Sequence, residues 1–356
     1  MLSERCNKLM EVLAAEGVDC ALITSGTNIR YFSDFLSDEA VLVISKDRRV
    51  LLTDFRYIIQ ANQLSAPTFE IVETSRAIAA EEIAAVLSEI GAKRCAFEDG
   101  YLTVRAFNSY KDLPVELVPM TPAIDRCRLV KNEYEIECLK KAQSIADAAF
   151  AELIRWIRPG MTEKQVANEL DHLLRVHGAD ENSFDTIVGS GPNGALPHAV
   201  PGNRVLTEGD LVVIDFGCKY NGYCSDMTRT IAIGEICDEL KKIYEIVKRA
   251  QQAAIDALRP NMEAKALDAV ARDVIAAEGY GDKFGHSLGH GFGLNIHEAP
   301  AASTRSQDIL IPGVTITVEP GIYIEDLGGV RIEDDCVLTE DGFINLASTT
   351  KELITI

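Results

Sequence analysis

Four acidic residues stand in apolar, strand-like stretches of the second half of this 356-residue chain. Asp215 follows a Val-Val-Ile run, and Asp226 comes eleven residues later. Glu319 and Glu333 lie in a second stretch, TITVEPGIYIEDLGGVRIEDD. Carboxylates buried together repel one another and are costly unless a cation compensates them. The pattern predicts a site for a positively charged species, unless that face is open to solvent.

A hairpin is expected to bring the first two acids together. Asn221-Gly222 lies between them, and this dipeptide favours a type I′ turn because both central residues of that turn have positive φ. A two-residue loop there pairs Tyr220 with Tyr223. Residues two apart share a face, so Asp215 then lies diagonally across from Asp226 on the same side.

The second pair of acids needs a turn of a particular length. Glu319 and Glu333 share a face only if the loop between their strands has an odd number of residues. A three-residue turn built on Leu327-Gly328-Gly329 would meet this condition.

Histidines supply the remaining candidate groups. Two of the six, His172 and His177, lie on a polar helix and are predicted to be structural. The other four lie in glycine-rich or strand-like contexts, and three of them fall within twelve residues, which indicates a site. These four are His198, His286, His290 and His297.

Four carboxylates and one imidazole carry about four negative charges, which two divalent cations would neutralise. Oxygen-rich ligand sets suit Mn²⁺, with Co²⁺ or Zn²⁺ as alternatives. A metal pair can hold a bridging hydroxide and polarise a carbonyl group. The predicted chemistry is therefore metal-assisted hydrolysis. The Asp-Phe-Gly at 215–217 matches a kinase tripeptide, but no Gly-rich loop or His-Arg-Asp loop precedes it.

An internal repeat supports this arrangement. One helix ends in Arg-Pro-Gly-Met at 158–161, and another ends in Arg-Pro-Asn-Met 101 residues later. The same alignment matches Asp215 with Glu319 at an offset of 104, and Asp226 with Glu333 at an offset of 107. Two halves, each of two helices and a hairpin, should pack about a pseudo-two-fold axis. Their strands should form one curved sheet backed by the helices.

The rest of the chain limits the possible partners. Residues 1–123 alternate between strand and helix patterns and should form a separate α/β unit. A formal charge of −20 argues against a nucleic acid or an anionic membrane as a partner. The first twenty residues match no signal-sequence pattern, so no secretion signal is expected, and no apolar run is long enough to span a membrane. Nine scattered cysteines without a Cys-x-x-Cys pair favour a reducing, cytoplasmic location.

The order Asp, eleven residues, Asp, then His, Glu and Glu resembles the dimetal signature of the creatinase, prolidase and aminopeptidase P family. The stretch LITSGTNIRYFSDF is also similar to the first domain of that family. The resemblance implies an α+β fold. A creatinase-like α/β domain at 1–123 would precede a pita-bread catalytic domain at 124–356.

The resemblance also implies a ligand for each metal. Asp215 would bind one ion, Asp226 and Glu333 would bridge both, and His290 and Glu319 would complete the second site. Glu319 would in addition accept a proton from the bridging water.

Other positions match family residues near the metals. His297 would donate to the developing oxyanion, His198 would contact the substrate, and His286 would help to shape the site. Arg331, two residues before Glu333, would orient a ligand carboxylate. Tyr323 matches a position that the family uses beside the metals.

The implied substrate is a peptide with proline in second position, because an imide nitrogen lacks an N–H and needs a dedicated pocket. Ala301 stands where a dipeptidase would carry a basic group for the substrate carboxylate, which favours an Xaa-Pro aminopeptidase over a prolidase. A metal-free creatinase-like hydrolase and a non-catalytic peptide-binding protein are further alternatives, but all five ligands are present. A homodimer is also implied.

Overall fold

The computed structural model describes residues 1–75 and 77–356. The chain divides into two compact units, Met1–Arg128 and Leu129–Ile356. The boundary expected near residue 123 falls inside the first unit, because the segment that follows it remains bound there. The Tyr31 hydroxyl donates to the carbonyl of Cys127 at 2.6 Å, and the Asn28 side-chain amide donates to Asp125 at 2.9 Å.

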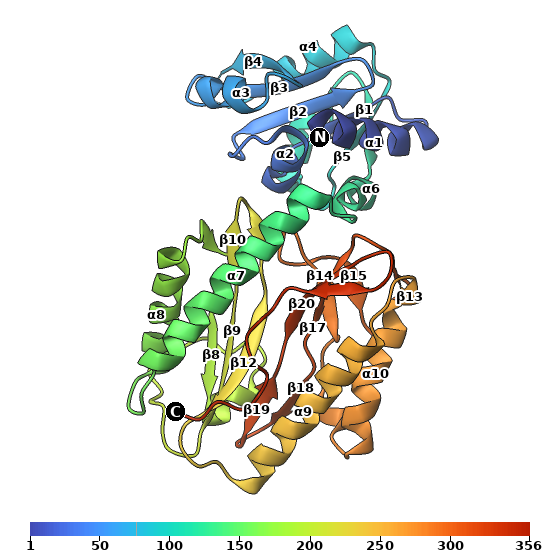
Figure 1. Ribbon diagram of the computed structural model, residues 1–356. Helices are drawn as coiled ribbons and strands as arrows, with labels where there is room; N and C mark the ends of the chain where they lie inside the picture. Colours follow the sequence, from blue (N-terminus) through green and yellow to red (C-terminus); the bar gives the residue numbers. More distant parts are fainter. Residues whose placement is uncertain (76) are drawn as a thin grey trace. The chain divides into compact units, whose positions relative to one another are not determined.

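The first unit is built on a six-stranded sheet in the order β4-β3-β2-β1-β5-β6 (Figure 1). The strands pair both parallel and antiparallel, and the α/β unit expected from the sequence forms. The strands are β1 (Cys20–Ile23), β2 (Ala40–Ser45), β3 (Arg49–Asp54), β4 (Glu70–Thr74), β5 (Arg94–Phe97) and β6 (Glu116–Pro119). The helices are α1 (Leu2–Ala15), α2 (Gly26–Ser33), α3 (Ile58–Leu64), α4 (Ala80–Ile90), α5 (Val104–Tyr110) and α6 (Thr121–Asp125).

The second unit contains the two halves of the repeat, each with two helices followed by paired strands (Figure 1). The first half comprises α7 (Glu133–Trp156), α8 (Glu163–Val176), β7 (Glu181–Asn182), β8 (Ile187–Ser190), β9 (Leu211–Phe216), β10 (Cys218–Tyr220), β11 (Tyr223–Cys224) and β12 (Met227–Ala232). The second half comprises α9 (Asp238–Ala257), β13 (Met262–Glu263), α10 (Ala264–Ala277), β14 (Gly289–Gly291), β15 (Glu298–Ala302), β16 (Ile309–Leu310), β17 (Thr315–Val318), β18 (Gly321–Ile324), β19 (Gly328–Arg331), β20 (Asp334–Leu338) and β21 (Phe343–Asn345).

Local signals place the long helix α7. The Asn132 side chain accepts the backbone N–H of Glu135 at 3.0 Å, and the Glu135 carboxylate accepts the N–H of Asn132 at 2.9 Å. This reciprocal capping box satisfies two backbone donors at the start of the helix. The apolar face of α7 then packs on β9, where Phe150 stacks on Phe216. None of the helices in the part of the chain that the structure describes could span a membrane.

The strands of the two halves meet along β12. The Glu333 N–H donates to the carbonyl of Thr228 at 3.1 Å, and the Thr230 hydroxyl donates to the carbonyl of Arg331 at 2.9 Å. The α+β fold and the repeat are thus confirmed. The strands form several short sheets rather than the single sheet expected, in part because Pro320, between β17 and β18, has no N–H for the ladder.

Candidate metal centre

The first hairpin forms as its sequence predicts. Tyr220 pairs with Tyr223, and both turn residues have positive φ, 48° at Asn221 and 79° at Gly222. The same register continues into β9 and β12, where Asp215 pairs with Thr228. Asp226, two residues before Thr228, therefore lies on the same face as Asp215.

The second hairpin has the expected length of turn but a different position. Ile324 pairs with Gly328, so the three-residue loop is 325–327 rather than Leu327-Gly328-Gly329. The left-handed position is taken by Asp326, at φ 63°, because a short polar side chain tolerates this conformation. The pairs on either side of Glu319 and Glu333 keep one register, which sets these two acids opposite each other.

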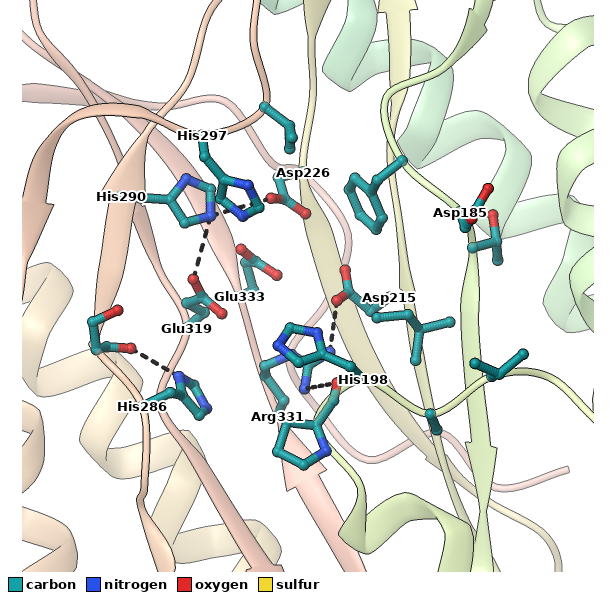
Figure 2. A pocket seen from close by; sticks show the side chains of 18 of the residues that line it. Asp185, His198, Asp215, Asp226, His286, His290, His297, Glu319, Arg331 and Glu333 are labelled. Atoms are coloured by element: carbon teal, nitrogen blue, oxygen red, sulfur yellow. Dashed lines mark hydrogen bonds and ion pairs between the residues drawn. The ribbon is translucent and has the colours of Figure 1, made fainter. Parts of the chain in front are cut away.

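The four acids and His290 converge across the seam between the halves (Figure 2). Carboxylate oxygens of Asp215, Asp226 and Glu333 lie within 4.8 Å of one another, and all three residues are buried. The Nε2 atom of His290 lies 3.7 Å from Asp226 Oδ2 and 3.6 Å from Glu319 Oε1.

Burial and mutual repulsion dominate the electrostatics of this cluster. Burial, reinforced by the Glu333 and Asp215 carboxylates, raises the pKa of Asp226 well above its usual range. Burial and the charges of Glu319 and Asp215 do the same to the pKa of Glu333. The pKa of Glu319 is raised to about 8, mainly by burial. Without a cation, the folded protein therefore resists full ionisation of the site.

Two atoms in the site fit a metal ion in particular. Asp215 Oδ1 is buried and has no hydrogen-bond partner among the described residues. His290 Nδ1 lies 3.0 Å from the carbonyl of Gly291, so this nitrogen carries the proton. The lone pair of Nε2 then faces the oxygens of Asp226 and Glu319, an arrangement that is repulsive unless a cation lies between them. Burial also lowers the pKa of His290 to about 4, which keeps the imidazole neutral and able to coordinate.

A chain of hydrogen bonds extends from the acids to His286. Arg331 Nη2 donates to Asp215 Oδ2 at 2.6 Å, and Arg331 Nη1 donates to the Tyr323 hydroxyl at 2.9 Å. The Tyr323 hydroxyl lies 2.9 Å from His286 Nε2, while His286 Nδ1 lies 2.8 Å from the carbonyl of Ser287. Nδ1 is therefore the donor, and Nε2 accepts from Tyr323. Burial alone would lower the pKa of the Arg331 guanidinium. The nearby Tyr323 and Asp215 outweigh this effect, and the pKa of Arg331 is raised.

The site opens into a pocket of about 570 Å³, within the range of small-ligand sites. Nine of the ten predicted site residues line it: Asp215, Asp226, His198, His286, His290, His297, Glu319, Arg331 and Glu333. Tyr323 is not among the lining residues, but its hydroxyl contacts two of them, His286 and Arg331. The His297 ring packs edge-on against His290, with centroids 4.4 Å apart. His172 and His177, predicted to be structural, are not among the lining residues.

Three further residues, which were not predicted, hold the candidate ligands in place. The Thr228 hydroxyl donates to Glu333 Oε2 at 2.6 Å, and the Thr317 hydroxyl lies 3.2 Å from Glu319 Oε1. The Asp335 carboxylate accepts the backbone N–H of Asp226 at 2.8 Å. Each of the three lies two positions from a ligand along a strand, so the alternation of faces could have identified them.

Metal-free protein is expected to lose stability as the pH rises from about 4 to about 8. Acids whose folded-state pKa is raised, as for Glu319, bind more protons when folded than when unfolded, so the free energy of unfolding falls across this window. The melting temperature in chelator should drop by roughly 5 °C or more. Added Mn²⁺ should remove the decline, because the ion stabilises only the folded state. A flat or rising melting temperature in chelator would contradict these pKa shifts.

Comparison with known proteins connects this geometry to a family. The family model described as "Metallopeptidase family M24" matches residues 137–340, and "Creatinase/Prolidase N-terminal domain" matches residues 5–130. The Xaa-Pro dipeptidase of Pyrococcus furiosus is 37% identical over 355 residues, covering 99% of this chain and 100% of that protein.

Two solved structures are similar throughout. The Xaa-Pro dipeptidase from Bacillus anthracis superposes with a TM-score of 0.97 at 42% identity, covering 100% of both chains. The X-Pro aminopeptidase from Thermotoga maritima gives a TM-score of 0.90 at 38% identity, covering 97% of this chain and 100% of the other.

Proposed function

Because the chain belongs to metallopeptidase family M24, we propose that it hydrolyses the bond between an N-terminal residue and a following proline. Relatives similar over nearly the full length of the chain carry the names Xaa-Pro dipeptidase and X-Pro aminopeptidase. The observation that carries the proposal is the buried convergence of four carboxylates with a neutral imidazole. Asp215 Oδ1 has no hydrogen-bond partner within the described part of the chain.

Two divalent cations per chain would be held by Asp215, Asp226, His290, Glu319 and Glu333. These ligands are four carboxylates and one imidazole, with no thiolate. Such a set suits Mn²⁺ and also accepts Co²⁺ or Zn²⁺. When bound, such a pair supplies a nucleophilic hydroxide near neutral pH and polarises the carbonyl of the substrate.

Glu319 is proposed to take up the proton that the attacking water releases. Its Oε1 atom lies 3.6 Å from His290 Nε2, beside the proposed metal sites, and a carboxylate there can accept a proton. The Thr317 hydroxyl, 3.2 Å from Oε1, holds the carboxylate in one orientation. Glu319 can then pass the proton to the departing proline nitrogen.

Two histidines on opposite walls of the pocket would contact the peptide. His297, at the end of the 291–298 loop, would donate a hydrogen bond to the oxygen of the scissile carbonyl as negative charge develops there. His198 follows Pro197, whose carbonyl accepts a hydrogen bond from Arg331 Nη1 at 3.2 Å, and would contact the substrate near the scissile bond. Both side chains line the pocket.

Arg331 and Tyr323 would act on the ligands rather than on the peptide. Arg331 holds Asp215 Oδ2 at 2.6 Å, which leaves Oδ1 facing the cluster. Tyr323 fixes the other side of the guanidinium, and His286 in turn fixes Tyr323. These bonds orient the Asp215 carboxylate before any cation arrives.

The pocket favours peptides longer than two residues. Among the lining residues that the structure describes, the one permanent cation is Arg331, which is already paired with Asp215. Ala301, where a basic group was considered, offers only its backbone N–H, and this donates to Asp308. The free carboxylate of a dipeptide would thus lie in the pocket without a cationic partner. We therefore propose an aminopeptidase preference, with prolidase activity as the alternative.

The comparison of Arg-Pro-Pro with Arg-Pro tests this proposal. Protein stripped with chelator and reloaded with Mn²⁺ should cleave the tripeptide with a kcat/KM at least ~10-fold higher, since the dipeptide carboxylate would be removed from water without a cationic partner, at a cost of roughly 1.4 kcal/mol or more. Equal or faster cleavage of the dipeptide would assign the protein as a prolidase. Absence of cleavage of both peptides by the reloaded protein would remove the Xaa-Pro assignment.

We also propose a cytoplasmic homodimer. The nine cysteines are free, which suits a reducing compartment. Phe55, in the turn before α3, and Ile59, in α3, are 69% and 75% exposed, and large exposed apolar side chains are typical of an interaction surface.

A further inference from the structure

We propose that a buried ion pair, Lys131 with Glu298, positions His297 in the pocket. The inference rests on the proposed function, in which His297 donates to the developing oxyanion. Neither residue of the pair lines the pocket. Their effect on the reaction would therefore be exerted through the loop that carries His297.

The two charges are almost completely removed from water. Lys131 Nζ lies 3.0 Å from Glu298 Oε2, and the side chains are 1% and 5% exposed. Removing two charges from water costs about as much as their attraction returns, so such a pair adds little net stability. A buried pair can nevertheless fix a local geometry, because each charge strongly restricts the position of the other.

Glu298 closes the loop that runs between the two site histidines. It pairs with Gly291 across β14 and β15, at a point where the register shifts between His290 and Gly291. Its Oε1 atom accepts the backbone N–H of Asn295 at 3.1 Å from inside the loop. Glu298 directly follows His297 in the chain. One oxygen of its carboxylate binds Lys131 and the other binds the backbone of Asn295, so the backbone that carries His297 is restrained.

Gly293 shows how closely the loop is packed on the ion pair. A Cβ atom at this position would lie 2.8 Å from Glu298 Oε2 and 3.0 Å from Lys131 Cε, so a side chain here would have to displace the ion pair. The carbonyl of Gly293 accepts the N–H of Cys224 at 2.8 Å, and Cys224 lies two residues before Asp226. The loop therefore contacts the ion pair through Gly293 and is hydrogen-bonded to the hairpin that carries Asp226.

Lys131 is itself anchored by the backbone. Its N–H donates to the carbonyl of Gly313 at 2.8 Å, and the next residue, Asn132, caps α7. The flexible lysine side chain therefore extends from a fixed point, and its ammonium group restricts the Glu298 carboxylate. The loop between His290 and His297 is positioned by an element far away in the sequence.

The test removes both charges together, because a single substitution would leave an unpaired buried charge. Lys131→Met with Glu298→Gln should lower kcat about 10-fold, with KM changed less than ~2-fold and two metal ions still bound. In a His297→Ala background, the same two substitutions should change kcat less than ~2-fold, because the group that they position is absent. Equal losses in both backgrounds, no loss in either, or loss of metal would overturn the inference.

A measurement without turnover separates this inference from the proposed function. In metal-free protein, the imidazole NMR signals of His297 should shift in the charge-free double variant, while those of His198 remain unchanged. Unchanged His297 signals would overturn the positioning role, whatever the activity. If the His297 signals shift in the double variant but the metal-loaded wild-type protein cleaves no Xaa-Pro peptide, the positioning role stands and the proposed function is removed. Arg204→Met with Asp210→Asn, which removes another ion pair, is the matched control and should leave the His297 signals unchanged.

Discussion

Asp226→Asn is expected to lower hydrolysis of Xaa-Pro peptides by at least ~10³-fold, which corresponds to about 4 kcal/mol of transition-state stabilisation. The amide is nearly the same size as the carboxylate but carries no charge, so it cannot compensate two cations. Metal content after dialysis against Mn²⁺ should fall below one ion per chain. Asp226 lies within 4.8 Å of both Asp215 and Glu333, so its loss affects both ions.

The fold of this variant should remain intact. In the metal-free state Asp226 is buried among acids, and removing its charge relieves their repulsion. The melting temperature of metal-free Asp226→Asn at pH 8 should therefore equal or exceed that of the wild type. Asp341→Asn, at an exposed acid after β20, is the control and should retain both metal and activity. Full activity in Asp226→Asn would contradict the dimetal site.

Glu319→Gln is expected to lower kcat by roughly 10³-fold through loss of the proton acceptor, within the range for general acid–base catalysis. The amide oxygen can still accept a hydrogen bond from Thr317 and face the cations, so KM should change less than ~3-fold. The measurement is steady-state kinetics on Arg-Pro-Pro, together with metal analysis of the same sample.

The metal analysis decides how the Glu319 result is interpreted. Retention of two ions with a large fall in kcat would support the role of proton acceptor. Loss of an ion would show that Glu319 acts chiefly as a ligand. A kcat close to that of the wild type, with both ions present, would exclude Glu319 as the base. Glu340→Gln, at a residue in the turn after β20, is the control.

The sequence was most informative where local geometry determined the structure. Asn221-Gly222 specified a two-residue turn, and the alternation of faces then placed Asp215 beside Asp226 without any knowledge of the rest of the chain. The second hairpin was less certain, because Asp326 can take the left-handed position as well as a glycine can. The length of that turn was predicted correctly, but its position was wrong.

Contacts between distant segments could not be predicted in this way. The bond from the Thr228 hydroxyl to Glu333 joins the two halves, and the repeat indicated only that they would face each other. The Lys131–Glu298 pair spans 167 positions, and neither residue belongs to a motif that suggests its partner. The division after Arg128 lies a few residues beyond the boundary expected near residue 123, because Asp125 and Cys127 are held by side chains of the first unit.

The Asp-Phe-Gly tripeptide illustrates the difference between a motif and a site. Asp215 does lie in the cluster, but its neighbours have local roles. Phe216 stacks on Phe150 in the core, and a Cβ at Gly217 would collide with the carbonyl oxygen of Ser225 at 1.9 Å. The hairpin turn and the repeat, rather than the tripeptide, identify the aspartate as a candidate ligand.

The most direct test of the dimetal centre is the number of ions bound per chain. Protein stripped with chelator, titrated with Mn²⁺ and measured by calorimetry and elemental analysis should bind two ions, and hydrolysis of Arg-Pro-Pro should appear as the sites fill. Asp226→Asn, measured in parallel, should bind fewer than one. Full activity in wild-type protein that holds no metal, or equal binding by the variant, would contradict the account.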